Sequence, residues 1–276
     1  MNQQILGLSS VALLCAMTAG ASADDASFDL GFEFTAASDY MDTGLTNSDH
    51  DPSFSMKFSP SYGIFYGEIY GATIDYGVPE PKLETKLAIG ATPQFGNLSV
   101  DFNLARRMKF DDASADRWLP YVTATYTFSD AFNASAGAGY YYYDDKAVHD
   151  FWELYLGATY SHASGSSLAG EFYWEPDSDG ADNHYYELIG TLTVPFMEKF
   201  EAVAKLGYEG YEDPAVASYL WYEARLNYSI TNHLVLSAVY HGNNLSNGDC
   251  PTQAWTDCDS ALFAVLTVKG SLSDLR

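Results

Sequence analysis

The stretch that decides the fold is FWELYLGATY, residues 151–160, where apolar and polar side chains alternate with a period of two. Trp152 and Leu154 fall on one face, and Glu153 falls on the other. This period predicts a β-strand with one apolar face, whereas a helix repeats every 3.6 residues. The same alternation recurs in further segments, including 28–35, 98–104 and 220–228.

Extending this pattern along the chain predicts an all-β protein of about fourteen strands, within a range of twelve to sixteen. The expected spans are 27–37, 52–59, 63–76, 82–92, 97–106, 118–128, 133–143, 150–161, 167–175, 184–194, 200–211, 218–230, 234–241 and 260–271. Short connections alternate with longer, polar ones, which is typical of a transmembrane antiparallel up-and-down β-barrel. A soluble β-sandwich is the alternative, but Tyr and Trp crowd the strand ends, as they do at membrane interfaces.

The N-terminal segment has the features of an export signal. Residues 1–23 carry no charged side chain, and their apolar stretch is too short to span about 30 Å of hydrocarbon. Ala21-Ser22-Ala23 is a small-residue cleavage pattern, so we predict a signal peptide that is cut between Ala23 and Asp24. Residues 24–276 then form the barrel domain.

The composition narrows the possible partners. With 37 acidic and 13 basic residues, the formal charge is −24, which argues against nucleic-acid binding because phosphate contacts need a basic surface. Cys250 and Cys258 share one polar segment, and two cysteines in an exported chain predict a disulfide. Two cysteines and one nearby histidine make a poor metal site, so no metal or cofactor is expected.

The polar faces of the strands identify candidate pore-lining residues. If the apolar faces meet lipid, the opposite faces line the lumen. The candidates are Asp29, Glu33, Lys57, Glu84, Lys86, Asp101, Glu153, Glu171, Glu187, Lys205, Glu223 and Arg225. Acids predominate, which predicts a water-filled pore that prefers cations. The alternative is that these charges pair across strands and fill a blocked lumen. Two spans, 63–76 and 133–143, show no clear alternation.

A basic cluster near one loop is the candidate constriction. It consists of Arg106, Arg107, Lys109 and Arg117. One interpretation is a basic wall that faces acids across the pore. The interpretation that we favour is pairing with the nearby loop acids Asp111, Asp112 and Asp116, because exposed ion pairs are common and weak.

Enzymatic chemistry is not expected from this sequence. It has no G-x-S-x-G, H-E-x-x-H or P-loop motif. His162, Ser164 and the downstream Glu175 are the residue types of an esterase triad. However, the predicted topology places His162 and Ser164 in a short turn, away from the longer loops.

Several phrases of the sequence together resemble porins of the TorF family. They are Ser38-Asp39-Tyr40 with Gly44 and Ser48-Asp49-His50-Asp51-Pro52, then residues 63–67 and 74–77, Phe151-Trp152-Glu153-Leu154-Tyr155, and Tyr185-Tyr186-Glu187-Leu188. The resemblance implies an outer-membrane barrel of Gram-negative bacteria with a passive-channel role. Met41-Asp42-Thr43 stands where that family often has an Arg-aromatic-Arg run. The sequence also ends without a terminal aromatic residue.

These observations lead to one preferred function and two alternatives. We expect a porin-like channel that lies among outer-membrane lipid and lipopolysaccharide and passes small hydrophilic solutes or ions by diffusion. One alternative is a non-conducting structural or adhesive barrel that acts through its surface loops. The other is a soluble exported β-protein that binds a ligand.

Overall fold

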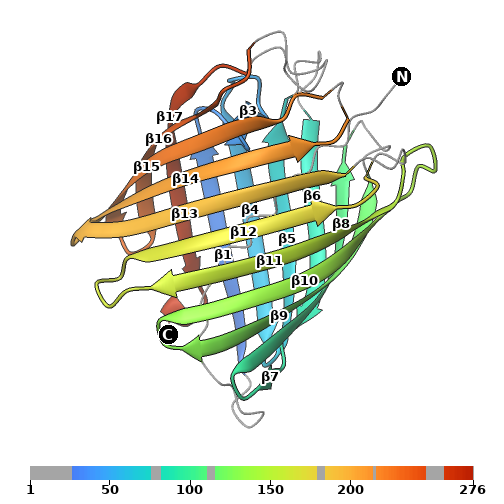
Figure 1. Ribbon diagram of the computed structural model, residues 1–276. Coiled ribbons are helices and arrows are strands. Elements are labelled where there is room, and N and C mark those ends of the chain that lie inside the picture. The colour runs from blue at the N-terminus through green and yellow to red at the C-terminus, as the bar shows by residue number, and fades with distance from the viewer. Residues whose placement is uncertain are drawn as a thin grey trace.

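The computed structural model describes residues 27–75, 82–110, 116–178, 184–213, 216–246 and 258–275. The predicted signal peptide, with Ala23 and Asp24, lies outside these ranges, as do Cys250, Asp111 and Asp112. The described chain is a closed antiparallel barrel of fourteen strands (Figure 1).

The fourteen barrel strands follow one another around the wall. They are β1 (Phe28–Ala37), β4 (Ser53–Tyr62), β5 (Phe65–Ile74), β6 (Lys82–Ala91), β8 (Leu98–Lys109), β9 (Arg117–Ser129), β10 (Phe132–Tyr143), β11 (Phe151–Ser161), β12 (Ser167–Glu175), β13 (Tyr185–Met197), β14 (Phe200–Tyr211), β15 (Tyr219–Thr231), β16 (Leu234–Asn243) and β17 (Ala261–Ser271). The smaller elements are β2 (Met41–Asp42), β3 (Leu45–Thr46), β7 (Gln94–Phe95) and the 3₁₀ turn η3 (Ser273–Leu275). The predicted all-β barrel and its strand number are confirmed.

The barrel closes because its first and last strands pair. β1 hydrogen-bonds to β17 from Gly31↔Ser271 to Ala37↔Val265, and β6 pairs with β8 past the short β7. In hydrocarbon every backbone N–H and C=O needs a partner within the protein, and closure leaves no open edge. The short turns gather at the lower end of Figure 1, here called the turn end, and the longer connections gather at the upper, loop end.

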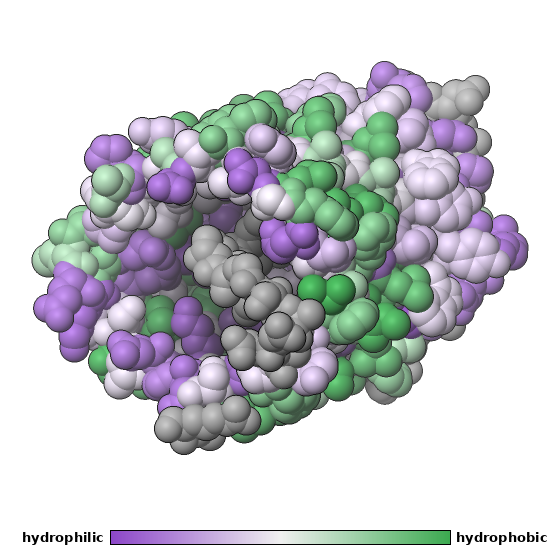
Figure 2. Space-filling view, turned by 90° about the horizontal axis from the view of Figure 1, so that it is seen from below, coloured by the Kyte–Doolittle hydropathy of each residue, from purple (hydrophilic) through white to green (hydrophobic). Residues whose placement is uncertain are grey.

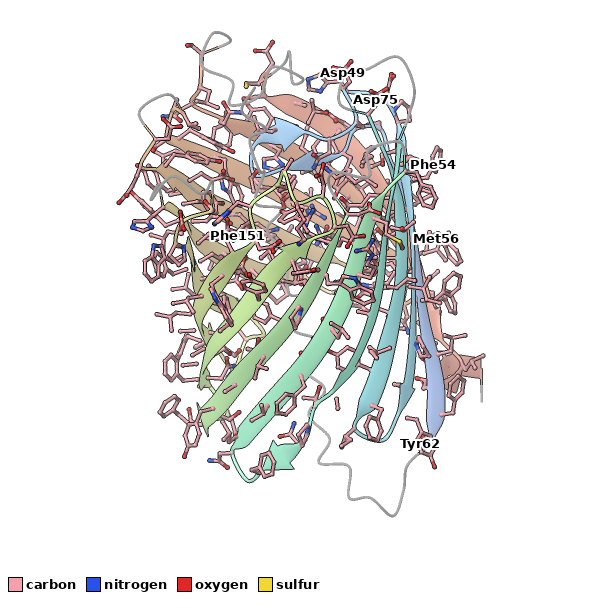
Figure 3. The ribbon with its side chains drawn as sticks, turned by 90° about the vertical axis from the view of Figure 1, so that its right-hand side faces the viewer. Asp49, Phe54, Met56, Tyr62, Asp75 and Phe151 are labelled. Carbon is pink, nitrogen blue, oxygen red and sulfur yellow. The ribbon has the colours of Figure 1, made fainter. Side chains whose placement is uncertain are left out.

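The outer wall carries large apolar side chains. Ile89, Leu206 and Leu262 are 58–76 % exposed, a degree of exposure that water would make costly and lipid makes favourable. Phe54 and Met56 likewise point away from the barrel (Figure 3). Exposed aromatic residues occur near both ends of the wall: Tyr62, Phe65, Phe128 and Phe196 at the turn end, and Trp118, Tyr142 and Trp152 at the loop end. Such belts are typical of membrane barrels. Across the described residues, no helix is both long and apolar enough to cross a membrane.

Several inward-facing rings lie against glycines of neighbouring strands. A Cβ added to Gly139 would lie 2.1 Å from the Tyr121 ring, and one added to Gly207 would lie 2.0 Å from the Trp221 ring. The missing side chains let these rings lie against the wall instead of projecting across the lumen. They also explain why the span 133–143 lacked clear alternation: the inner face of β10 carries Gly137 and Gly139 where other strands carry polar side chains.

Candidate functional site

The candidate site is the lumen of the barrel. All twelve predicted pore-lining residues lie on its inner face, because residues paired across strands share a face and the alternate residues are the exposed apolar ones. They are Asp29, Glu33, Lys57, Glu84, Lys86, Asp101, Glu153, Glu171, Glu187, Lys205, Glu223 and Arg225. Seen from the turn end, the barrel is hollowed, and hydrophilic residues gather around the hollow (Figure 2).

Most of the basic residues on this face have acidic neighbours. Lys86 Nζ lies 2.9 Å from Glu68 Oε1, and Lys57 Nζ lies 3.8 Å from Glu33 Oε1. Other short separations join Arg107 to Glu84 (3.9 Å), Arg225 to Glu223 (3.0 Å) and Lys205 to Glu223 (4.0 Å). The charges therefore pair along the wall, as the blocked-lumen alternative required. However, the two partners of each pair lie on the same strand or on two neighbouring strands. These pairs therefore do not bridge the lumen.

The basic cluster divides between the two faces of the wall. Arg106 pairs in register with Leu87 and Trp118 on the outer face, so its assignment to a constriction was wrong. Its guanidinium lies 5.3 Å from the centre of the Trp118 ring and also contacts Asp116 (3.3 Å) and Asp144 (2.5 Å). The hydrogen bond from Arg106 is the main reason that the pKa of Asp144, in the β10–β11 loop, is lowered.

The other three members of that cluster face inward. Arg107, Lys109 and Arg117 are on the opposite face from Arg106 because consecutive strand residues alternate. The Arg117 guanidinium lies 5.6 Å from the ring centres of both Tyr141 and Tyr143, and only 5 % of the residue is exposed. These residues form a basic strip on β8 and β9 at the loop end of the lumen.

Residues 38–52, here called the inward segment, form the principal feature that sequence reasoning missed. The segment connects β1 to β4 and carries the β2–β3 hairpin, which lies inside the upper part of the barrel (Figure 3). Leu45 is fully buried, and Asp39 is 3 % exposed. The Asp39 carboxylate accepts hydrogen bonds from Thr46 Oγ1 (3.0 Å) and Ser48 Oγ (3.2 Å) and lies 2.7 Å from His50 Nδ1. These contacts fold the segment into a compact unit.

The inward segment is held on two sides of the lumen. On one side, Gly44 N–H donates to His241 Nε2 (3.0 Å), and Asn243 Nδ2 donates to Gly44 O (2.5 Å). On another, Asp75 N–H donates to Asn47 O (2.8 Å) just beyond β5. Gly44 has φ +84°, and an added Cβ would lie 2.7 Å from Trp221 Cβ, so only glycine fits this position. The segment therefore narrows the lumen at a fixed place.

Acidic and tyrosine side chains cover the lumen wall of β10 to β15. Glu175, Glu187 and Glu209 are at most 2 % exposed. Tyr141 Oη donates to Glu153 Oε2 (3.0 Å), and Tyr211 Oη donates to Glu209 Oε2 (2.7 Å). Glu175 and Glu209 were not among the twelve selected positions, although their strands alternate in the same way. Of the possible triad residues, His162 and Ser164 lie in the β11–β12 turn and Glu175 lies at the opposite end of β12.

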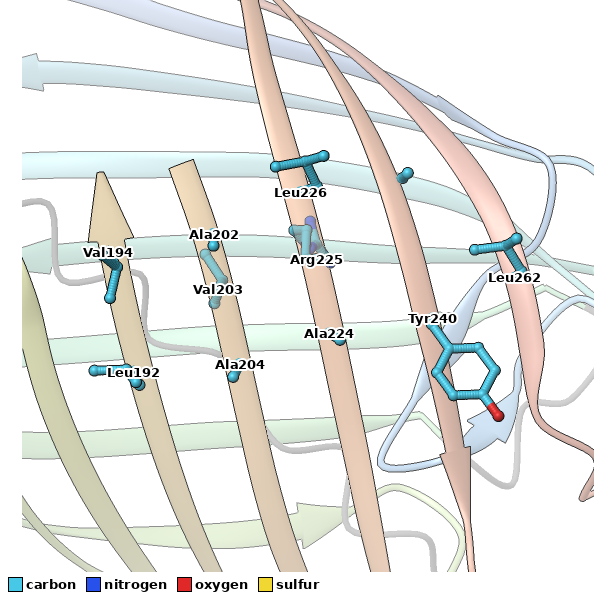
Figure 4. Close-up of a pocket in the computed structure, with 11 residues that line it drawn as sticks. Leu192, Val194, Ala202, Val203, Ala204, Ala224, Arg225, Leu226, Tyr240 and Leu262 are labelled. Atoms are coloured by element: carbon cyan, nitrogen blue, oxygen red, sulfur yellow. The ribbon is translucent and has the colours of Figure 1, made fainter. Parts of the chain in front are cut away.

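The described chain contains no metal cluster, and one pocket lies on its outer wall. No group of three or more His, Cys, Asp or Glu residues within the described ranges could hold a metal ion. A shallow depression on the outer wall is floored by small residues such as Ala204 and Ala224 and bordered by Leu192, Leu226 and Tyr240 (Figure 4). Its lining is apolar and faces lipid, so it offers a hydrophilic solute no contacts.

Comparison with known proteins supports the fold without naming a family. No known family and no curated protein matches the sequence, so the resemblance to the TorF family stays a prediction. Solved porin structures do match, at 10–11 % identity. The OmpF structure of Salmonella typhi, in complex with daunomycin, has a TM-score of 0.56 over 90 % of this chain and 97 % of that one. The anion-selective porin from Comamonas acidovorans has 0.50 over 90 % and 100 %, and Omp33 of Acinetobacter baumannii has 0.52 over 89 % and 98 %.

Proposed function

We propose that this protein is an outer-membrane channel through which small hydrophilic solutes diffuse passively, with a preference for cations. The observation that carries the proposal is a closed barrel with an apolar outer wall and a lumen face rich in carboxylates. Side chains can fill the interior of an eight-stranded barrel, and a fourteen-stranded barrel encloses more space than that. The porins that share this fold support a channel role.

The cation preference follows from the charges along the lumen. Inward-facing acids outnumber inward-facing bases on the strands, and Asp39 and Asp42 of the inward segment add to them. Carboxylates along a pore create a negative potential that concentrates cations and repels anions. The porin from Comamonas acidovorans has a similar fold and is anion-selective, so the fold alone does not set the sign of selectivity.

Planar-bilayer recording tests this proposal. The purified protein should give discrete conductance steps, and the reversal potential in a KCl gradient should show that K⁺ permeates better than Cl⁻. A reversal potential of the opposite sign would contradict the charge argument. The absence of any conductance would instead favour the non-conducting barrel, which the packed loop end of the lumen makes the second candidate.

The membrane location has its own test. We propose that export removes residues 1–23 and that the barrel lies among outer-membrane lipid and lipopolysaccharide. Fractionation should recover the protein in the outer membrane, with Asp24 as its first residue. Recovery in the soluble periplasm would support the ligand-binding alternative.

The predicted Cys250–Cys258 disulfide should appear as a mass increase of two alkyl groups when the protein is alkylated after reduction.

A further inference from the structure

Asp42 of the inward segment lies between opposite walls of the barrel. Its carboxylate interacts electrostatically with Arg107 on β8 and Glu84 on β6, and also with Lys205 on β14 and Glu223 on β15. In the order of strands around the barrel, β6 and β8 are neighbours, and β14 and β15 lie half the circumference away. A side chain that interacts with both walls lies in the interior of the barrel between them, where a permeating ion would pass.

The wall charges near Asp42 compensate one another locally. Arg107 lies 3.9 Å from Glu84, while Glu223 lies 3.0 Å from Arg225 and 4.0 Å from Lys205. Each wall therefore presents both signs of charge, so its effect on an ion at the axis is partly cancelled. Asp42 keeps part of its surface exposed, whereas Met41 and Leu45 beside it are buried. The charged partners of Asp42 are two cations, Lys205 and Arg107, and two carboxylates, Glu84 and Glu223, so the charge of Asp42 itself is added to a balanced set.

We propose that Asp42 is the residue that determines ion selectivity in this channel, and that loss of its charge weakens the cation preference. The proposal rests on the proposed channel function and adds the residue that controls it. It also gives a role to Met41-Asp42-Thr43, the place where the sequence departs from the family that it resembles.

The surroundings of Asp42 place its titration in an accessible range. Burial raises the pKa of Asp42 to about 6, the cations Lys205 and Arg107 act to lower this pKa, and Glu84 and Glu223 act to raise it. Glu209 on β14 also interacts with Asp42. Tyr40, on the same segment, stays neutral because burial raises its pKa well above the usual value. The central charge is therefore present at pH 8 and largely lost at pH 4.5.

The test compares wild type with Asp42→Asn in planar bilayers, with the K⁺/Cl⁻ permeability ratio measured in a KCl gradient at pH 8 and pH 4.5. At pH 8 the variant should have a ratio about tenfold lower, because one charge about 6 Å from the ion in a water-like dielectric attracts K⁺ by a factor of about three and repels Cl⁻ by a similar factor. At pH 4.5 the two proteins should have the same ratio, because Asp42 is then protonated in the wild type.

Two control variants make the outcome specific. Asp42→Glu keeps the charge and should retain the wild-type ratio at pH 8. Asp130→Asn removes the same charge from the exposed β9–β10 turn and should leave the ratio unchanged at both pH values. Asp42→Ser repeats the test with a smaller side chain, and heat-dependent migration in electrophoresis confirms that each variant is folded.

Three results would overturn the proposal. If the wild type conducts but Asp42→Asn has the same ratio at pH 8, Asp42 does not set selectivity and the channel function stands. If the tenfold difference persists at pH 4.5, protonation of Asp42 is not the cause of any pH dependence. If the folded wild type does not conduct, the channel function fails and this inference fails with it.

Discussion

The loop end and the turn end of the lumen differ sharply, although the same strands form both. At the loop end, Glu187 and Glu209 are 1–2 % exposed. Farther from the loop end, the Glu33 side chain at the middle of β1 and the Glu68 side chain in the turn half of β5 are 32 % and 26 % exposed. All four glutamates occupy equivalent inward positions in the alternation. The difference shows that strand periodicity decides which face a side chain is on, while a connecting segment decides whether water reaches it.

The inward segment is one physical cause of this difference. It brings Leu45 against Tyr219 and Trp221 of β15, with Tyr155 and Tyr173 in the same cluster. Burial of these side chains stabilises the packed loop end, and it leaves the carboxylates there to be satisfied by tyrosine hydroxyl groups instead of water. No hairpin of the described residues covers the wall farther from the loop end, where the Glu33 and Glu68 side chains stay partly exposed beside Lys57 and Lys86.

The largest expected effect comes from breaking the contact that holds the inward segment. Gly44→Leu places a Cβ 2.7 Å from Trp221 Cβ and 2.9 Å from Asn243 Cβ, at a backbone φ that leucine disfavours. Positive φ and overpacking together should lower the free energy of unfolding by about 2–5 kcal/mol. Urea unfolding in lipid vesicles should show the loss, and single-channel conductance should rise as the segment leaves the wall. An unchanged conductance and unfolding midpoint would mean that the segment does not narrow the lumen.

An intermediate effect is expected from removing one carboxylate at each end. Glu209→Ala leaves the buried Tyr211 hydroxyl without its 2.7 Å acceptor, so the free energy of unfolding should fall by about 1–3 kcal/mol. Glu33→Ala removes a partly exposed group 3.8 Å from Lys57 and should cost less than about 1 kcal/mol. Both values come from the same urea titration. If both variants lost the same free energy of unfolding, Glu209 and Glu33 would not differ in burial as the structure indicates.

The smallest effect should come from an ion pair at the turn end. A double-mutant cycle with Glu68→Ala and Lys86→Ala measures the coupling between these residues, which lie 2.9 Å apart. Their hydrated position predicts a coupling of about 0.2–1 kcal/mol that decreases as salt is added. A salt-insensitive coupling of several kcal/mol would instead place this pair in a dry lumen.

The wall of the barrel was predictable because its rule is local. The period of two in segments such as 151–160 places Glu153 inside and Trp152 outside without reference to any other strand. The same rule predicts that Arg106 and Arg107 lie on opposite faces. Their assignment to one basic cluster followed their closeness in sequence and did not apply this alternation. The span 133–143 failed as a signal because Gly137 and Gly139 stand in place of polar residues where the Tyr121 ring needs space. The span 63–76 failed because its inner face carries Tyr66, Tyr70 and Ile74 instead of a run of polar side chains.

The interior of the lumen was not predictable in the same way. Residues 38–52 contain the polar and small residues of an ordinary loop, and nothing in their order states that they turn inward. Gly44 was a weak signal, because its importance depends on Trp221, His241 and Asn243, which are distant in sequence. The place of Asp42 near the axis depends on the closure of all fourteen strands.

The sequence by itself determined an all-β chain, its strand number and the inward or outward direction of its side chains. These features follow from the sequence because they depend only on short segments. Alternation occurs within one strand, and each apolar face is costly to expose to water by itself. Only the tertiary structure decided which inward residues are buried, which arginine lies on the outer face and which carboxylate lies between opposite walls of the barrel. Those outcomes require contacts between segments up to about 200 residues apart, such as Gly44 with Asn243.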